Sequence, residues 1–302
     1  MEGYSGSMLN KLLTEQQHPA SARIGELGTV EMLAVMNAAD AEVAAAVALE
    51  IPRIAAAVDA IAARLGRGGH LTYIGAGTSG RLGVLDASEC PPTFSVPPEL
   101  VRGIIAGGEK ALSRATEATE DDPEAGARDL LASGFGPGDA LVGIAASGRT
   151  PYVLGAVAAA RKMGALTAGI SCTPDSELSR AVEFPMEPKP GPEIITGSTR
   201  LRAGTATKMV LNMISTGVMI RLGYIYGNLM VNVQPTNKKL EDRARRIIEQ
   251  AAGVTEKRAA ELLEESGRSV RTAIVMEKKK VSREEAEALL LKAGGRIGIA
   301  LL

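Results

Sequence analysis

Short apolar runs alternate with helical stretches through the middle of the chain. The runs fall at residues 71–74, 101–106, 140–145, 166–171 and 181–184. Strands that alternate with helices are typical of a parallel sheet covered by helices on both faces. The pattern therefore predicts an α/β fold whose core is a parallel sheet made of these runs.

Helical patterns flank the sheet on both sides. Residues 30–65 carry apolar side chains at helical spacing, interrupted by Pro52, which predicts two helices, and residues 203–222 predict a long, mostly buried helix. After residue 237 the composition becomes charged and helix-forming, which predicts a small bundle. We expect a helical segment at 1–56, the sheet domain at 57–222 and a C-terminal helical domain at 238–302.

Local signals mark the ends of the C-terminal helices. Breaks are expected at Gly253, at Gly267 and at the pair Gly294 and Gly295. Ser282 followed by Glu285 forms a capping-box pattern, which predicts a helix start.

The first apolar run leads into a glycine loop, residues 75–81, that opens a predicted helix. A helix N-terminus offers unpaired N–H groups and a positive dipole end, so this loop is suited to binding a phosphate. Thr78 and Ser79 add hydroxyl donors, and Arg81 adds a charge. The glycines also fit the dinucleotide pattern, but Glu99 precedes the second strand, so no acidic residue is placed to hold a ribose. A purely structural turn is the other alternative.

A second loop of the same chemistry follows the run at 140–145. It contains Ser147, Gly148 and Thr150 and leads into a helix opened by Pro151. Adjacent parallel strands bring such loops to the same edge of a sheet, where ligands of open α/β sheets bind. We therefore expect both loops to surround one phosphate, the alternative being ordinary helix capping.

Glu89 is a candidate general acid. Pro91 and Pro92 are expected to end the helix that begins near Thr78, which leaves Glu89 in its last turn or just beyond. A carboxylate there faces the negative end of the helix dipole, so we expect a raised pKa and a proton available at neutral pH. The alternative is an exposed Glu without a role.

An acidic cluster lies between two predicted helices. Its members are Glu117, Glu120, Asp121, Asp122 and Glu124. Asp122 and Pro123 are expected as the N-cap and first residue of the second helix. From the residues alone, Glu120 is no better a catalytic candidate than Glu117.

Residues 191–205 form a third polar segment, just before the long buried helix. We expect this segment to be a third wall of the ligand site, with Ser198, Thr199 and Arg202 as contacts to sugar or phosphate. Helix capping explains Ser198 and Thr199 but not the whole run.

Composition excludes several classes of partner. The net charge is −1 with both signs interspersed, so we expect no nucleic-acid or membrane partner. The two cysteines and two histidines lack metal-ligand spacing, so we expect no metal. No leader pattern or apolar run of about 18 residues is present, so we expect a cytoplasmic protein.

Together these motifs resemble those of the N-acetylmuramic acid 6-phosphate etherases, a family of the sugar isomerase (SIS) superfamily of phosphosugar-binding domains. The matching runs are residues 14–15, 19–21, 75–81, 85–94, 191–205 and 231–237. The resemblance implies a flavodoxin-like, three-layer αβα fold with a five-stranded parallel sheet, a C-terminal helical domain and a homodimer.

The resemblance also implies an activity. Etherases of this family cleave the D-lactyl ether of their substrate without a cofactor, giving N-acetylglucosamine 6-phosphate and D-lactate in peptidoglycan recycling. Glu89 matches the acid that protonates the departing lactate, and Glu120 matches the second active-site carboxylate. Arg202 stands where Lys is usual, which exchanges a point donor for a planar fork. Gln17, His18 and Gly25 also depart from the usual pattern.

Two other functions remain open. One is a noncatalytic phosphosugar sensor that resembles the glucokinase regulatory protein, and the other is a phosphosugar isomerase of the same superfamily. The intact segment around Glu89 and the short, single-SIS chain favour the enzyme over the sensor. An isomerase would interconvert aldose and ketose without releasing lactate.

Overall fold

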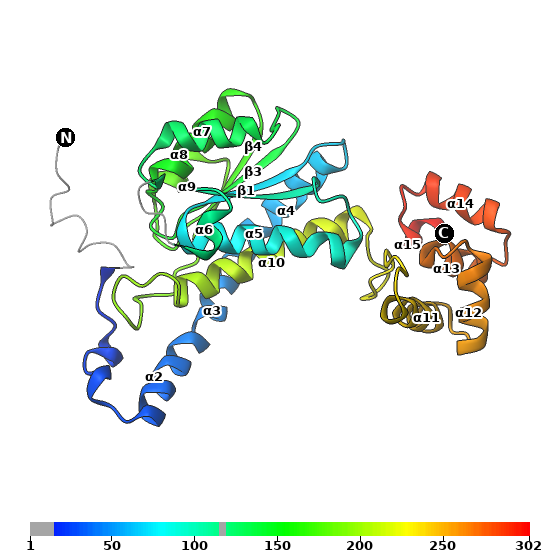
Figure 1. The fold of residues 1–302 in the computed structure, drawn as a ribbon, viewed down its shortest axis with the longest axis horizontal. Coiled ribbons are helices and arrows are strands. Elements are labelled where there is room, and N and C mark those ends of the chain that lie inside the picture. Colours follow the sequence, from blue (N-terminus) through cyan, green and yellow to red (C-terminus); the bar gives the residue numbers. More distant parts are fainter. Residues whose placement is uncertain (1–14, 115–118) are drawn as a thin grey trace. The chain divides into compact units, whose positions relative to one another are not determined.

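The structure is a computed structural model that describes residues 15–114 and 119–302. The chain forms two compact units (Figure 1). Unit 1 comprises Met1–Ser88 and Glu99–Ser215, and unit 2 comprises Glu89–Pro98 and Thr216–Leu302. Thr14 and Glu117, which the sequence singled out, lie outside the described residues.

Unit 1 is built around a five-stranded parallel sheet with the order β2-β1-β3-β4-β5. Its strands are β1 (Leu71–Gly75), β2 (Val101–Ile105), β3 (Ala140–Ile144), β4 (Leu166–Ile170) and β5 (Phe184–Met186). The predicted parallel sheet is confirmed. Its last strand starts later than expected, because residue 181 ends a short helix, α9 (Glu177–Ala181).

Helices cover both faces of the sheet, which makes three layers. One face carries α7 (Pro123–Ala132), α8 (Pro151–Lys162) and α9; the other carries α4 (Ile51–Leu65), α5 (Gly77–Phe94) and α10 (Arg202–Leu222). Alternate strand residues face opposite layers. Ile74 packs with Val153 of α8, whereas a Cβ on Gly83 of α5 would lie 3.1 Å from the Cβ of Tyr73.

Helices α7 and α8 approach each other unusually closely. A Cβ on Gly126 would lie 1.8 Å from the carbonyl oxygen of Tyr152, and one on Gly155 would lie 2.0 Å from that of Pro123. Asp122 is the N-cap of α7, as predicted, and it accepts from the N–H of Ala125 at 2.9 Å. That hydrogen bond lowers the pKa of Asp122.

Helix α5 continues past the two prolines that were expected to end it. It runs from Gly77 to Phe94 and contains both Pro91 and Pro92. The expectation was wrong because proline's φ fits a helix, and Pro91 accepts a hydrogen bond through its carbonyl from the N–H of Ser95 at 2.8 Å. The helix ends where Ser95 takes a left-handed φ of 51°. Asp86, in the middle of α5, accepts from Asn212 of α10 at 2.6 Å and fixes the two helices together.

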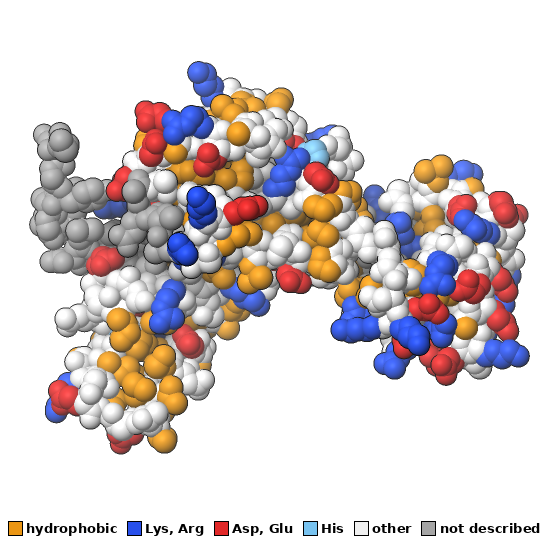
Figure 2. Space-filling view, viewed as in Figure 1, with side chains coloured by type: hydrophobic (Ala, Val, Ile, Leu, Met, Phe, Trp, Pro, Cys, Tyr) orange, Lys and Arg blue, Asp and Glu red, His pale blue; other side chains and the backbone are white. Residues whose placement is uncertain are grey.

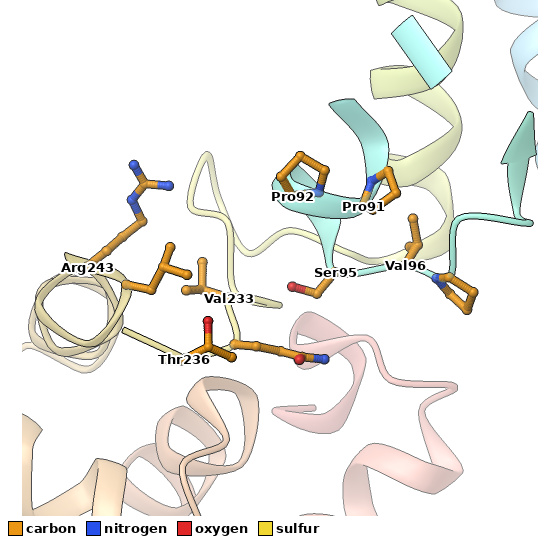
Figure 3. Close-up of a pocket in the computed structure, with 10 residues that line it drawn as sticks. Pro91, Pro92, Ser95, Val96, Val233, Thr236 and Arg243 are labelled. Atoms are coloured by element: carbon orange, nitrogen blue, oxygen red, sulfur yellow. The ribbon is translucent and has the colours of Figure 1, made fainter. Parts of the chain in front are cut away.

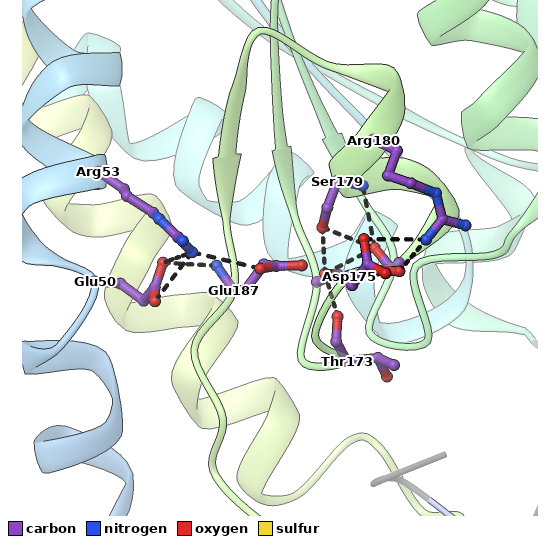
Figure 4. A network of polar contacts seen from close by, with 9 residues as sticks. Glu50, Arg53, Thr173, Asp175, Ser179, Arg180 and Glu187 are labelled. Atoms are coloured by element: carbon purple, nitrogen blue, oxygen red, sulfur yellow. Dashed lines mark hydrogen bonds and ion pairs between the residues drawn. The ribbon is translucent and has the colours of Figure 1, made fainter. Parts of the chain in front are cut away.

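The N-terminal residues form short helices before the sheet. They are the 3-10 turns η2 (Pro19–Ser21) and η3 (Ile24–Glu26), then α2 (Thr29–Ala41), α3 (Val43–Ala48) and α4. Pro52 lies in the first turn of α4, so the break predicted there is confirmed, but a further break at Glu42 gives three helices where two were expected. Glu50 accepts from the backbone N–H of Glu187 at 2.9 Å and from Arg53, which joins the start of α4 to the segment after β5 (Figure 4).

Among the described residues, no single helix is both long and apolar enough to cross a membrane. One bent pair, Thr29–Ala48 with Ile51–Leu65, passes that test by length and composition alone.

Unit 2 contains a helical bundle around its own apolar core. The bundle is formed by α11 (Lys238–Ala252), α12 (Glu256–Glu265), α13 (Val270–Lys279), α14 (Arg283–Lys292) and α15 (Ile297–Ala300). The remaining short helix, α6 (Lys110–Ser113), belongs to unit 1. The capping box of Ser282 and Glu285 is confirmed at the start of α14. Gly253 ends α11 at a φ of 72°, a conformation that glycine adopts without strain.

Candidate functional site

Two of the hydroxyl-bearing loops leave the sheet side by side. β1 pairs with β3 in parallel, with Gly75 opposite Ile144, so the loop that opens α5 and the loop that opens α8 start from the same edge. Thr78 and Ser79 lie in the first turn of α5 and are partly exposed, as are Ser147 and Thr150 in the second loop. The expected juxtaposition of the two loops therefore follows from the topology of unit 1.

The third polar segment also reaches the glycine loop. A Cβ on Gly204, in the first turn of α10, would lie 3.7 Å from the Cγ2 of Thr78 and 3.4 Å from the carbonyl oxygen of Thr199. Ser198 and Thr199 are partly exposed beside this contact. Three loops from separate parts of the sequence thus bring hydroxyl groups into one region.

Glu120 lies directly at the glycine loop. A Cβ on Gly77 would be 3.2 Å from the Oε1 of Glu120, so the carboxylate lies close against the backbone of this glycine. The carbonyl of Glu120 accepts from the N–H of Tyr152, in the first turn of α8, at 3.1 Å. Its side chain faces one hydroxyl loop while its backbone is bound to the helix that follows the other. Among the described members of the acidic cluster, geometry places Glu120 at the glycine loop, a distinction that the sequence alone did not make.

The second loop is shaped by a turn that requires a positive φ. Gly148 has a φ of 67°, and its N–H donates to the carbonyl of Ala145 at 2.8 Å, so its contribution to the loop is conformational. Thr150 is the N-cap of α8 but makes no side-chain capping bond, and Ser147 accepts from the N–H of Arg149 at 3.4 Å. Ordinary helix capping thus does not account for the hydroxyl of Thr150.

The guanidinium of Arg81 donates hydrogen bonds to backbone carbonyls. It donates to the carbonyls of Ala111 at 3.0 Å, Leu112 at 3.2 Å and Arg114 at 3.3 Å. These hydrogen bonds of Arg81 connect the start of α5 to the segment after β2. Its direct contact with a phosphate stays a prediction.

Arg202 is buried, with 2% of its surface exposed. It forms an ion pair with Glu42 at 2.6 Å and donates to the carbonyl of Pro192 at 3.1 Å. The side chain thus joins the N-terminal helices to the segment before α10. As for Arg81, a direct substrate contact stays a prediction.

Glu193 lies in the polar segment 191–205, and its role was not indicated by the sequence. Its carboxylate is 1% exposed and accepts from the N–H groups of Arg202 at 2.8 Å and Ala203 at 2.9 Å. Burial raises the pKa of Glu193, while these N–H groups act in the opposite direction. The N-terminus of α10 is therefore capped from within the chain. No local sequence pattern indicated this cap, because Glu193 lies nine residues before Arg202, the first residue of the helix that it caps.

Glu89 lies on α5 with an exposed side chain. It lies eleven positions after Thr78, which is about three turns, so the two side chains lie on nearly the same face of the helix. Because α5 runs on to Phe94, Glu89 is not in the last turn, and the argument based on the helix end loses its premise.

Unit 2 has a cavity of its own, of about 530 Å³ (Figure 3). Ser95, Gln234, Thr236 and Arg243 supply polar groups to its lining, together with Pro91, Pro92, Val96, Pro97, Val233 and Leu240. The side chain of Asn232 donates to the carbonyl of Phe94 at 2.9 Å, which holds the two lining segments together. The run at 231–237 is thereby part of the wall of a cavity in this unit.

Comparisons with known proteins identify the family. Residues 53–161 match the model of the glucokinase regulatory protein N-terminal SIS domain. The chain is 51% identical to the N-acetylmuramic acid 6-phosphate etherase of Rhodopirellula baltica, over 96% of each chain. It is 53% identical to that of Aeromonas hydrophila, over 96% of this chain and 97% of the relative. The chain belongs to the N-acetylmuramic acid 6-phosphate etherase family. The etherases are carbon–oxygen lyases with an SIS domain, and the recognition made from the motifs is confirmed.

Solved structures agree on the fold of the etherase. A protein described as a phosphosugar isomerase involved in capsule formation, from Bacteroides fragilis, superposes with a TM-score of 0.50 and 19% sequence identity. The match covers 64% of the etherase chain and 91% of that protein. The predicted SIS fold with a five-stranded parallel sheet and additional C-terminal helices is therefore confirmed.

Proposed function

We propose that this chain hydrolyses the D-lactyl ether of N-acetylmuramic acid 6-phosphate, acting through Glu89 and Glu120. The observation that carries the proposal is the position of Glu120, whose carboxylate lies against Gly77 among three hydroxyl loops. A carboxylate beside an anion-binding loop repels a phosphate, so a site built only to hold phosphosugars gains nothing from it. A site that removes a proton from the bound sugar requires it.

The reaction follows from the chemistry of the open-chain sugar. The C1 aldehyde acidifies the proton on C2, which Glu120 removes as base. The electron pair forms a double bond between C2 and C3, and the C3–O bond breaks as Glu89 protonates the departing lactate. Water then adds to C3 and a proton returns to C2, giving N-acetylglucosamine 6-phosphate. Each proton transfer contributes roughly 10²–10⁴-fold to the rate, and no step uses a cofactor.

The phosphate is held mainly by hydroxyl groups in this proposal. Thr78 and Ser79 act from the first loop, Ser147 and Thr150 from the second, and Ser198 and Thr199 from the third. Gly148 gives the second loop its turn. Arg81 and Arg202 act through the segments that they bind, since their guanidinium groups donate to backbone carbonyls and to Glu42.

The proposal is tested by following both products in D₂O. Purified protein supplied with N-acetylmuramic acid 6-phosphate should release D-lactate and N-acetylglucosamine 6-phosphate in equal amounts, with one deuterium on C2 of the sugar. D-Lactate is measured with a stereospecific dehydrogenase, and the label is measured by mass spectrometry. Binding of the substrate without lactate would favour the sensor, and an aldose–ketose product would favour the isomerase.

We also propose that the chain forms a homodimer through the apolar surface of its N-terminal helices. Ala39 is the buried residue of α2, whereas Val30 is 83% exposed and Leu33 53% exposed; Leu49, just before α4, is 81% exposed. Hydrophobic side chains gather on this part of the surface in Figure 2. An isolated helix of α2's length is marginal in water, so this surface needs a permanent partner. A second copy of the chain meets that need.

Leu33→Asp should convert the dimer to a monomer at micromolar concentration, because it places a charge in the apolar contact. Leu131→Asp is the matched control, since Leu131 has the same exposed fraction, 53%, on α7 of the same unit. Light scattering after size exclusion measures the mass of each variant. A dimeric Leu33→Asp variant, or a wild-type monomer, would contradict this surface as the interface.

A further inference from the structure

A chain of buried hydroxyl groups lies behind the second loop. Ser171, at the end of β4, is 1% exposed, and Ser176, before α9, is 4% exposed. The hydroxyl of Ser176 donates to Ser171 at 3.1 Å, and Ser171 donates to the carbonyl of Thr173 at 3.0 Å. Ser179 completes the chain, with its hydroxyl 2.8 Å from that of Ser176 (Figure 4). Buried hydroxyls bound to each other in this way hold a segment in one conformation.

Ser176 lies in direct contact with the loop. A Cβ on Gly148 would be only 2.2 Å from the Cβ of Ser176 and 2.3 Å from its Oγ. The left-handed φ of Gly148 and this contact both require glycine. The backbone of Gly148 is therefore pressed against Ser176.

The same segment binds the loop on both sides of Ser147. The carbonyl of Ala146 accepts from the N–H of Cys172 at 2.9 Å and from the hydroxyl of Thr173 at 3.4 Å. The carbonyl of Gly148 accepts from the N–H of Leu178 at 2.9 Å. Ser147 thus stands between two backbone groups that residues 172–178 hold in place.

We infer that Ser176 is a positioning residue that fixes the loop 146–150 in its phosphate-binding conformation before the phosphosugar arrives. The inference rests on the proposed function, because it assigns Ser147 and Thr150 to the phosphate. Holding the loop beforehand lowers the ordering cost of binding, so its loss appears in affinity. The side-chain hydrogen bonds of Ser176 are to Ser171 and Ser179, so we expect kcat to stay near the wild-type value.

The test compares Ser176→Ala with Ser282→Ala. Both serines are N-caps that accept from the N–H three residues later, Ser176 for α9 and Ser282 for α14 in unit 2. Each variant loses a helix cap, which costs about 1 kcal/mol of stability, but only Ser176 touches the loop. The readouts are KM for N-acetylmuramic acid 6-phosphate, kcat, and Ki for inorganic phosphate as a competitive inhibitor.

Ser176→Ala should raise KM and Ki together by about tenfold, the equivalent of about 1.4 kcal/mol, with kcat near the wild-type value. Ser282→Ala should lower the melting temperature and leave both constants unchanged. Ser179→Ala removes one hydroxyl of the chain but does not change the contact with Gly148, so it should raise Ki by a smaller factor. This variant replaces Ser176→Ala in the test if Ser176→Ala does not fold.

An unchanged Ki in the folded variants would overturn the inference while leaving the proposed function intact. A wild-type protein that neither releases lactate nor binds phosphate would instead contradict the proposed function itself. The two failures are therefore distinguishable within one set of measurements.

Discussion

Glu89→Gln should lower the rate of D-lactate release by orders of magnitude and leave the binding of N-acetylmuramic acid 6-phosphate intact; together with Glu120→Gln, this is the largest catalytic effect we expect. Glutamine keeps the shape of the side chain but has no acidic proton for the departing lactate. Loss of a general acid reduces the rate roughly 10²–10⁴-fold. The measurement is the initial rate of D-lactate formation, together with the dissociation constant from calorimetry.

The isotope label separates the two carboxylates. Removal of the C2 proton precedes departure of lactate, so Glu89→Gln should still exchange that proton for deuterium in D₂O. Glu120→Gln should lose exchange and lactate release together. Glu99→Gln is the control, because Glu99 is also an exposed glutamate and lies just before β2. Full lactate release by Glu89→Gln would contradict the assignment of the acid, and exchange by Glu120→Gln would contradict that of the base.

The largest effect on stability is expected for Gly126→Ala. The new methyl group would lie 1.8 Å from the carbonyl oxygen of Tyr152, a backbone atom that cannot rotate away. Helices α7 and α8 must then separate, and overpacking of this kind costs about 1–3 kcal/mol or more. We expect a loss of at least about 3 kcal/mol in the free energy of unfolding, measured by urea denaturation.

Activity should fall with stability in this variant. Glu120 precedes α7 and its carbonyl is bonded to Tyr152, so a shift between the two helices displaces the proposed base. The control is Gly298→Ala, because no atom lies within 4 Å of a Cβ at that helical position. It should change stability by less than about 1 kcal/mol, in the stabilising direction. Equal effects of the two substitutions would show that α7 and α8 tolerate separation.

The sequence predicted the parts of the fold that follow from periodicity. Short apolar runs at β1 and β3, each followed by glycine and hydroxyl residues, specify a strand, a turn and a helix start within one stretch of chain. Because neighbouring parallel strands end at the same edge of a sheet, the loops after β1 and β3 come together without any other contact having to be predicted. The cap at Asp122 was predictable for the same reason, since its partner Ala125 lies three residues away.

The long-range contacts of the site region could not be predicted from the sequence. Nothing near Arg81 indicates that its guanidinium binds carbonyls about thirty residues later, and nothing near Arg202 indicates a partner at Glu42. A cationic side chain in a polar segment is typical of anion binding, so both were assigned to the phosphate. The extension of α5 through Pro91 and Pro92 was missed because proline is judged by the hydrogen bond it lacks, although its carbonyl still accepts one.

The cap that Glu193 forms at the N-terminus of α10 affects how tightly the protein can bind its product. Glu193 accepts hydrogen bonds from the amides of Arg202 and Ala203, so these two donors at the start of α10 are already occupied before any ligand arrives. In the proposed site the phosphate is then held by neutral hydroxyl donors, which bind a dianion less strongly than cations do. Under this proposal the weaker binding favours turnover, because substrate and product carry the same phosphate and the product must leave in every cycle.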